Sequence, residues 1–196
     1  MRVRFFNPGL AYNKIKDEVL SEIDRVLTNG DLILRKDVED FEKSIAEYAS
    51  EKLWKPLGAE HPAYWSTDEQ GMEKVSCCWY SNARDFARLA RLMMRYGNWD
   101  GNQIIDSSYA IASVKAAGDL VDSETKLPIK KYGYQWWLLE YKNHPVFFMR
   151  GIRGQYVFAI PDEHLIIVRL GHKRDPLKWN DIPVDVYFYL DVGIGL

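Results

Sequence analysis

Apolar residues recur at helical spacing in the first quarter of the chain. They repeat at steps of three and four positions from Ile15 to Leu27, behind Asn13 as an N-cap. A second amphipathic run begins at Asp37, whose side chain can cap it, and reaches about Tyr48. This pattern predicts two helices within residues 1–49.

The middle of the chain mixes short regular elements with loops. A helical piece over 50–58 ends at a proline, and an irregular stretch over 59–74 follows it. Loops of this length within a domain are uncommon and often functional, so this stretch, with His61 in it, is a candidate functional loop. The other elements predicted here are a strand over 75–80, a helix that Asn82 caps and that includes Met93, a turn over 97–101, and a helix over about 107–117.

From residue 132 onward the chain takes on the composition of β-strands. Four segments are rich in aromatic and β-branched residues, and Pro161-Asp162 favours a hairpin turn between the last two. We therefore predict an α/β (α+β) fold, in which an antiparallel C-terminal sheet packs with helices and an N-terminal helical arm is added. The predicted strands are 132–139, 145–149, 155–160 and 165–170.

Composition narrows the class of protein. The 196 residues are 47% hydrophobic and 14% aromatic, which suits one domain with a core, or one domain with a helical appendage. The formal net charge of −2 gives no electrostatic reason to expect nucleic acid or a charged membrane as partner. No apolar run is long enough for a signal peptide or a membrane span, so the sequence predicts a cytoplasmic protein.

Cysteine and histidine offer little site chemistry. Cys77 and Cys78 are adjacent and are the only cysteines, and we expect two reduced, partly buried thiols on one strand because vicinal disulfides are strained. The four histidines, His61, His144, His164 and His172, have no metal-binding spacing. Neither a metal nor a cofactor is therefore expected.

Five short motifs lie in order along residues 50–172: LWKPLG from Leu53, NARDFAR from Asn82, GNWDG from Gly97, YGYQWW from Tyr132, and RGIRGQ from Arg150. Their order and spacing resemble the C-terminal part of the β-lactamase-related serine hydrolases. That group holds class C β-lactamases, DD-peptidases, esterases and 6-aminohexanoate-dimer hydrolases. The resemblance implies a β-lactamase-like fold and a relation to amide or ester hydrolysis.

Members of this group use a Ser-x-x-Lys nucleophile, then a Tyr-x-Asn proton relay, then a Lys/His-Thr-Gly strand. The nucleophile needs a neighbouring base because an unassisted serine hydroxyl reacts poorly. In the family the first two motifs precede the Pro-Leu-Gly segment, and residues 1–52 contain neither of them. We therefore expect a truncated, catalytically inactive remnant of a serine hydrolase.

Two segments match the residue patterns of the absent motifs. Ser123 to Lys126 reads Ser-x-x-Lys and Tyr80 to Asn82 reads Tyr-x-Asn, but they occur in the reverse of the family order. Ser123 falls in a polar loop, where nothing desolvates Lys126 or fixes its amine against the hydroxyl. Ser123, Lys126 and Tyr80 are thus weak catalytic candidates, and Asn82 is expected to act as a helix cap.

The third motif has a clearer counterpart, because Met149-Arg150-Gly151 falls where the family has Lys/His-Thr-Gly. Arg150 or Arg153 could bind a carboxylate bidentately, and a backbone N–H near Gly151 could face an oxyanion. The alternative is surface arginines on an edge strand. Trp136 and Trp137 alternate across their strand, so at most one faces the core, and the other could line the cleft or an interface. Core packing of the tryptophan and tyrosine side chains is the favoured alternative. The binding candidates are Arg150, Gly151, Arg153 and Trp136.

The first 49 residues contain Phe6–Gly9, Val26–Gly30 and Asp37–Glu42, and these stretches resemble the start of sugar aminotransferases of the DegT/DnrJ/EryC1/StrS type. In that family the lysine that binds pyridoxal phosphate lies much further along, so no cofactor residue carries over. We predict a division into an aminotransferase-like helical segment, 1–49, and a hydrolase-like domain, 50–196. A fusion of two gene fragments is the simplest explanation.

Two other functions remain open. Exposed apolar surface would suit a binding module that self-associates or recruits a protein partner. A pyridoxal-phosphate enzyme is the third alternative, and it has the least support because the cofactor-binding region has no counterpart in the chain.

Overall fold

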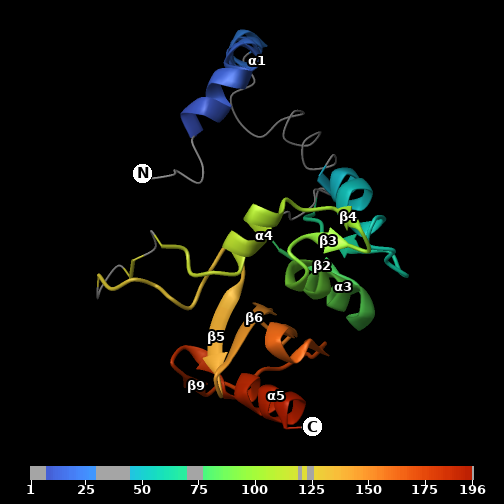
Figure 1. The fold of residues 1–196 in the computed structure, drawn as a ribbon. Coiled ribbons are helices and arrows are strands. Elements are labelled where there is room, and N and C mark those ends of the chain that lie inside the picture. Colours follow the sequence, from blue (N-terminus) through green and yellow to red (C-terminus); the bar gives the residue numbers. More distant parts are fainter. Residues whose placement is uncertain (1–7, 30–44, 70–76, 119–120, 123–125, 196) are drawn as a thin grey trace.

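A computed structural model of the chain describes residues 8–29, 45–69, 77–118, 121–122 and 126–195. The helix predicted from Asp37 and the start of the strand predicted at Val75 fall mainly outside these ranges. The first predicted helix is confirmed as α1 (Pro8–Asn29), which lies away from the sheet in Figure 1. The predicted N-cap was wrong, because α1 begins five residues before Asn13 and Asn13 lies within the helix. Within the described ranges, no helix is both long and apolar enough to cross a membrane.

Four antiparallel strands form the main sheet, as predicted. They are β5 (Trp137–Tyr141), β6 (His144–Arg150), β7 (Tyr156–Ile160) and β8 (Leu165–Arg169), in the order β5-β6-β7-β8. The turn predicted at Pro161-Asp162 is confirmed as a 3₁₀ turn, Pro161–Glu163. Every residue of β7 is buried, because β7 lies between β6 and β8 and both of its faces are covered.

Helices cover the two faces of this sheet. On one face α5 (Val184–Ile194) buries Val186 and Leu190 against Phe148 and Phe158. On the other face α3 (Ala83–Met94) buries Ala90 and Met93 with alternate strand residues, among them Phe147, Val157 and Ala159. Fully burying a large apolar side chain contributes about 1.5 to 3 kcal/mol, so these two layers supply much of the stability of this region.

A third apolar cluster joins α3 to the segment before it. Trp54, at the end of the π-helical turn η1 (Ser50–Trp54), packs with Leu57, Leu89, Leu92 and Trp99. Trp99 belongs to a small hairpin of β3 (Asn98–Trp99) and β4 (Asn102–Gln103). The cluster therefore ties the Pro-Leu-Gly segment to the helix that follows it.

Several predicted boundaries were wrong. The strand predicted from 132 begins at Trp137, because residues 132–136 form a tight turn in which Gln135 has a φ of 66°. The helix predicted over 107–117 ends earlier, as α4 (Ser107–Ser113). The long loop contains β1 (Tyr64–Trp65), which pairs with β2 (Trp79–Tyr80). No element was predicted for the last segment, which holds β9 (Lys178–Trp179), β10 (Ile182–Pro183) and α5.

The prediction for the cysteines was also wrong. Cys77 and Cys78 are exposed and are joined in a vicinal disulfide immediately before β2. Cys78 has a φ of 73°, so the backbone bends here and does not continue as a strand. In a strand adjacent side chains point to opposite faces, whereas this bend brings the two sulfur atoms together.

Candidate functional site

The C-terminal end of β6 presents an arginine beside an aromatic ring. The Arg150 guanidinium lies over the Trp137 ring, 4.4 Å from its centroid, and its Nη1 donates to the Asp181 carbonyl at 3.0 Å. Partial burial lowers the pKa of Arg150, and the nearby Arg174 lowers it further. Arginine remains protonated in proteins under such conditions, so Arg150 supplies a fixed, partly desolvated positive charge.

In the turn after β6, backbone N–H groups form hydrogen bonds within the turn itself. The Gly151 N–H donates to the Gln155 carbonyl at 2.8 Å, and the Arg153 N–H donates to Gln155 Oε1 at 3.1 Å. A Cβ at Gly151 would lie 2.4 Å from Gln155 Oε1, so a larger residue there would require the Gln155 side chain to move. The Gly151 amide is thus engaged in the hairpin, while Ile152 at the tip is 79% exposed.

Two further groups support this corner from β7 and β8. Arg169 donates to the Gly154 carbonyl and lies near the Tyr156 and Tyr189 rings. Tyr156 is fully buried, and its hydroxyl donates to Asp185 Oδ1 at 3.1 Å. Burial and the Asp185 carboxylate raise the pKa of Tyr156 to about 12. Tyr156 is therefore neutral near pH 7 and acts as a donor, not as a base.

Of the two adjacent tryptophans, Trp136 is the more buried. It is 8% exposed and packs edge-on against Phe147 in the α3-facing layer. Trp137 packs on the opposite, α5-facing layer and carries Arg150 on its ring. The binding candidates Arg150, Gly151 and Arg153 thus lie together at the end of β6, whereas Trp136 lies in the core beneath it.

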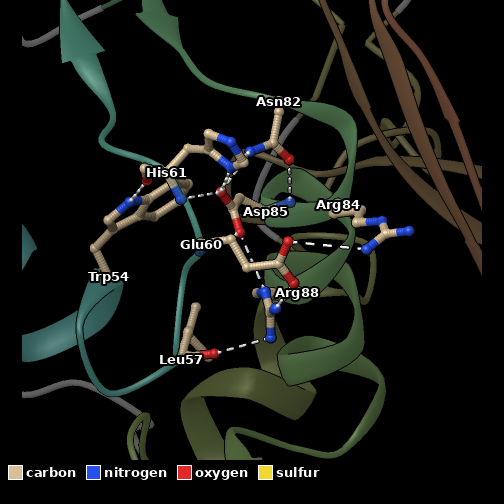
Figure 2. Close-up of polar contacts among 8 residues, drawn as sticks. All are labelled: Trp54, Leu57, Glu60, His61, Asn82, Arg84, Asp85 and Arg88. Carbon is tan, nitrogen blue, oxygen red and sulfur yellow. Dashed lines mark hydrogen bonds and ion pairs between the residues drawn. The ribbon is translucent and has the colours of Figure 1, made fainter.

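A second polar site lies at the start of α3, and we call it the Asp85 cluster (Figure 2). The Asp85 side chain is fully buried and accepts hydrogen bonds from the backbone N–H groups of Glu60 at 2.9 Å and His61 at 3.0 Å. It also accepts from Asn82 Nδ2 at 2.7 Å and from Arg88 Nε at 3.1 Å. The cluster therefore fixes the loop after Pro56-Leu57-Gly58 to α3.

The pKa of Asp85 reflects two opposing effects. Burial by itself raises this pKa, but the four hydrogen bonds together outweigh burial and hold it below its usual value. Asp85 is therefore ionised at neutral pH. Its charge is neutralised by Arg88, which also donates to Glu60 Oε1 at 2.6 Å and to the Leu57 carbonyl at 3.4 Å.

His61 projects from this cluster into solvent. Its Nδ1 lies 2.7 Å from Asn82 Nδ2 and 3.8 Å from Asp85 Oδ2, and the side chain is 65% exposed. An amide nitrogen can only donate, so Nδ1 accepts and the neutral ring carries its proton on Nε2. The predicted cap is confirmed as well, since Asn82 Oδ1 accepts from the Asp85 N–H at 3.0 Å.

The catalytic candidates lie on separate parts of the chain. Ser123 lies outside the described residues. Lys126 is exposed, with a φ of 58°, in the loop before β5. Tyr80 is 58% exposed on β2, and its hydroxyl accepts from Ser66 Oγ at 3.2 Å. Among the described serines, none is hydrogen-bonded to a lysine amine or a histidine ring.

Within the described part of the chain, no three histidine, cysteine, aspartate or glutamate side chains come together in a way that could hold a metal ion.

Asp85 and Arg88 were not identified from the sequence as a buried pair. The Asn82-x-x-Asp85 cap was visible, but the partners of Asp85 at Glu60 and His61 lie 25 and 24 positions earlier.

Comparison with known proteins adds a family relationship. A family model described as Beta-lactamase matches residues 31–181. The 6-aminohexanoate-dimer hydrolase of Paenarthrobacter ureafaciens is 29% identical over 161 residues, covering 76% of this chain and 39% of that protein. A solved structure described as "Putative 6-aminohexanoate-dimer hydrolase from Bacillus anthracis" has 27% identity and a TM-score of 0.57, covering 74% of this chain and 37% of that one. The chain thus spans about two fifths of the length of each of these relatives.

Proposed function

The chain belongs to the beta-lactamase family, and from this premise we propose that residues 50–196 correspond to the part of a serine hydrolase that follows its nucleophile motif. By itself this part does not hydrolyse amides or esters. The observation that supports the proposal is that Met149 and Arg150 end β6 and Gly151 follows it, since these three residues resemble the family's Lys/His-Thr-Gly strand end in their place along the chain. The alignment with about two fifths of each relative supports it.

In this proposal the end of β6 keeps the substrate-binding half of the site. Arg150 offers a partly buried guanidinium, and Arg153 lies three residues further along the exposed turn. A guanidinium binds a carboxylate through two parallel hydrogen bonds, so a substrate or peptide with a free carboxylate fits this corner. The amide of the exposed Ile152 is the backbone group that remains to face an oxyanion.

Turnover assays test the proposal. The substrates are a p-nitrophenyl ester for esterase activity and nitrocefin for β-lactamase activity. The linear dimer of 6-aminohexanoate, which appears in the name of the relatives, serves for amide hydrolysis. We expect no hydrolysis above the uncatalysed rate by the wild-type chain, and none by Ser123→Ala. A wild-type rate that Ser123→Ala abolishes would show that Ser123 is a nucleophile and would overturn the proposal.

A second candidate function is an interaction module. Several large apolar side chains are about half exposed or more on α5 and near β8, and apolar surface of this kind could be covered by a partner. They include Phe188 at 62%, Val192 at 48% and Leu170 at 47% exposed. A chain whose role is assembly needs no nucleophile, so this function is compatible with the first proposal.

The aminotransferase-like origin of residues 1–49 stays a prediction, as does the domain boundary after residue 49. The family match begins at residue 31, inside this segment. If this segment were part of a pyridoxal-phosphate enzyme, adding the cofactor would produce an absorbance band of an internal aldimine. We expect no such band. Its appearance, with loss on borohydride reduction to a lysine adduct, would favour the aminotransferase alternative.

A further inference from the structure

We propose that Cys77 and Cys78 form a reversible thiol–disulfide exchange site, and that its redox state sets the conformation of the adjoining ribbon of β1 and β2. The site reacts with small external thiols, the class to which glutathione belongs. The inference is independent of the proposed relation to serine hydrolases. It starts from three features of the cysteine pair, which are its exposure, its backbone conformation and its hydrogen bonds to the end of β1.

The two cysteines are accessible to reagents in solution. Both residues are exposed, and they are bonded to each other immediately before β2. A thiolate must reach one of the sulfur atoms to break a disulfide, so exposed disulfides are more readily reduced than buried structural ones. The chain contains no other cysteine with which this bond could rearrange. Exchange at this site therefore takes place with a thiol from outside the chain.

The exchange is a two-electron reduction of the disulfide. An external thiolate attacks one sulfur atom and forms a mixed disulfide, while the bond between Cys77 and Cys78 breaks and the other sulfur leaves as a thiolate. A second external thiolate attacks the mixed disulfide and releases the reagent as its own disulfide. The two cysteines gain two electrons and the two protons of the reagent thiols. An oxidised reagent reverses the reaction and restores the bond.

The disulfide holds Cys78 in a backbone conformation that side chains disfavour. Its φ of 73° lies in the left-handed region, where Cβ is crowded by the following carbonyl oxygen. Adjacent side chains of a regular strand point to opposite faces, so the two sulfur atoms could not be bonded if the strand continued through this pair. After reduction no covalent link keeps the side chains together, and Cys78 can relax to an extended conformation. The bend thus depends on the bond.

The carbonyl groups of the cysteine pair connect this bend to the end of β1. The Cys77 carbonyl accepts from Trp65 Nε1 at 3.0 Å, and the Cys78 carbonyl accepts from the Ser66 N–H at 3.0 Å. A change in the backbone angles of Cys78 redirects its carbonyl group, because these angles set the direction of the peptide units on either side. Reduction therefore weakens the hydrogen bond that the Ser66 N–H donates.

The other side of the ribbon is attached to the core. The Trp79 ring stacks on Trp65, with centroids 5.4 Å apart, and lies 4.9 Å from the Trp54 ring. Trp54 is buried in the apolar cluster that joins the Pro-Leu-Gly segment to α3. Trp79 thereby anchors β2, so we expect the redox change to be confined to the cysteine pair and the end of β1.

Alkylation of the folded full chain tests the exchange chemistry. Iodoacetamide should leave the mass unchanged when the protein is purified without a reductant. After treatment with millimolar glutathione it should add one carbamidomethyl group to each cysteine, and circular dichroism should show that the fold is retained. Alkylation of both cysteines without glutathione would mean that the bond is absent. No alkylation after glutathione would mean that it does not exchange, and either result would overturn the proposal.

Amide hydrogen exchange at Ser66 tests the coupling to the ribbon. We expect about tenfold faster exchange in the reduced chain, because the bend that places its acceptor is no longer held. The Gly151 N–H, which donates to the Gln155 carbonyl at 2.8 Å in the turn after β6, is the control and should exchange equally in both states. Equal exchange of Ser66 in the two states would overturn the conformational part of the proposal.

Two variants separate the bend from the thiol chemistry. Cys77→Ser/Cys78→Ala lacks the disulfide and disfavours the bend, so Ser66 should exchange as in the reduced wild type. Cys77→Ser/Cys78→Gly also lacks the disulfide, but glycine adopts a positive φ without steric cost. Its Ser66 amide should exchange more slowly, closer to the oxidised wild type, and neither variant should respond to glutathione. Equal exchange in the two variants would overturn the link between the bend at Cys78 and the ribbon.

Discussion

At the residue scale, Asp85 illustrates how one ionised group can organise a loop. Asp85 is the one charged side chain among the described residues that is completely buried. Four hydrogen-bond donors from three segments converge on it. A buried carboxylate is tolerated only when its hydrogen bonds and charge are satisfied. Removing the carboxylate therefore leaves Arg88 Nε and two backbone N–H groups without this acceptor, while Arg88 keeps its bonds to Glu60 and Leu57.

Asp85→Ala is expected to lower the free energy of unfolding by roughly 3 kcal/mol, the usual cost of breaking a buried charged pair. Urea denaturation measures this directly. Asp100→Ala is the matched control, since Asp100 is exposed and pairs with Arg91 and Arg95 at the surface. Its removal should change the free energy by less than about 1 kcal/mol. Equal effects of the two substitutions would contradict the role given to Asp85.

The pH dependence of stability follows from the lowered pKa of Asp85. Above the unfolded-state pKa of about 4, both states are ionised and the full stabilisation is present. As the pH falls through the folded-state pKa, the carboxylate takes up a proton and that stabilisation is lost. The free energy of unfolding should therefore fall below about pH 4, and Asp85→Asn should flatten that dependence. An unchanged slope in Asp85→Asn would exclude Asp85 as its source.

At the scale of elements, the sequence predicted what repeats locally and missed what depends on distant contacts. The C-terminal strands were predictable because β-branched and aromatic residues are concentrated in them, and the start of α3 because Asn82 is a cap residue. α5 was missed because its sequence is rich in valine and aromatic residues, with no side-chain cap. Its helical form depends on packing against the sheet, which outweighs local propensity.

The candidate site residues show the same difference between local sequence patterns and distant contacts. Arg150, Gly151 and Arg153 are close in sequence, so their grouping at the end of β6 was foreseeable. The Asp85 cluster joins groups about 25 positions apart, and the tight turn at 132–136 depends on contacts with α4, where the Tyr134 N–H donates to the Ser113 carbonyl at 2.9 Å. Contacts of this kind leave no periodic signal in a single sequence.

The β3–β4 hairpin offers a test at this scale. Gly97 has a φ of 81°, and a Cβ there would lie 2.1 Å from the Ile105 carbonyl oxygen. Gly97→Ala should therefore cost roughly 3 kcal/mol or more in the free energy of unfolding, from strain and collision together. Gly101, with a φ of 96° and no atom within 4 Å of its Cβ position, is the matched control. Gly101→Ala should cost about 1 to 2 kcal/mol, and equal losses in urea denaturation would contradict this account.

At the scale of the whole molecule, helices cover both faces of the four-stranded sheet, and Arg150, Gly151 and Arg153 lie together at the end of β6. The family match spans this sheet. The central claim is that this chain carries the family scaffold without an activated serine. It makes a chemical prediction that does not depend on knowing the substrate.

Intact-mass analysis of folded protein after treatment with a fluorophosphonate, and separately with a penicillin, tests that claim most directly. A fluorophosphonate captures serines that a neighbouring base has activated, and a penicillin acylates the nucleophile of its own target enzymes. We predict an unchanged mass with both reagents, under conditions in which a β-lactamase-type control protein is fully labelled. A single stoichiometric adduct that maps to one serine, and that is lost when this serine is replaced by alanine, would contradict the claim.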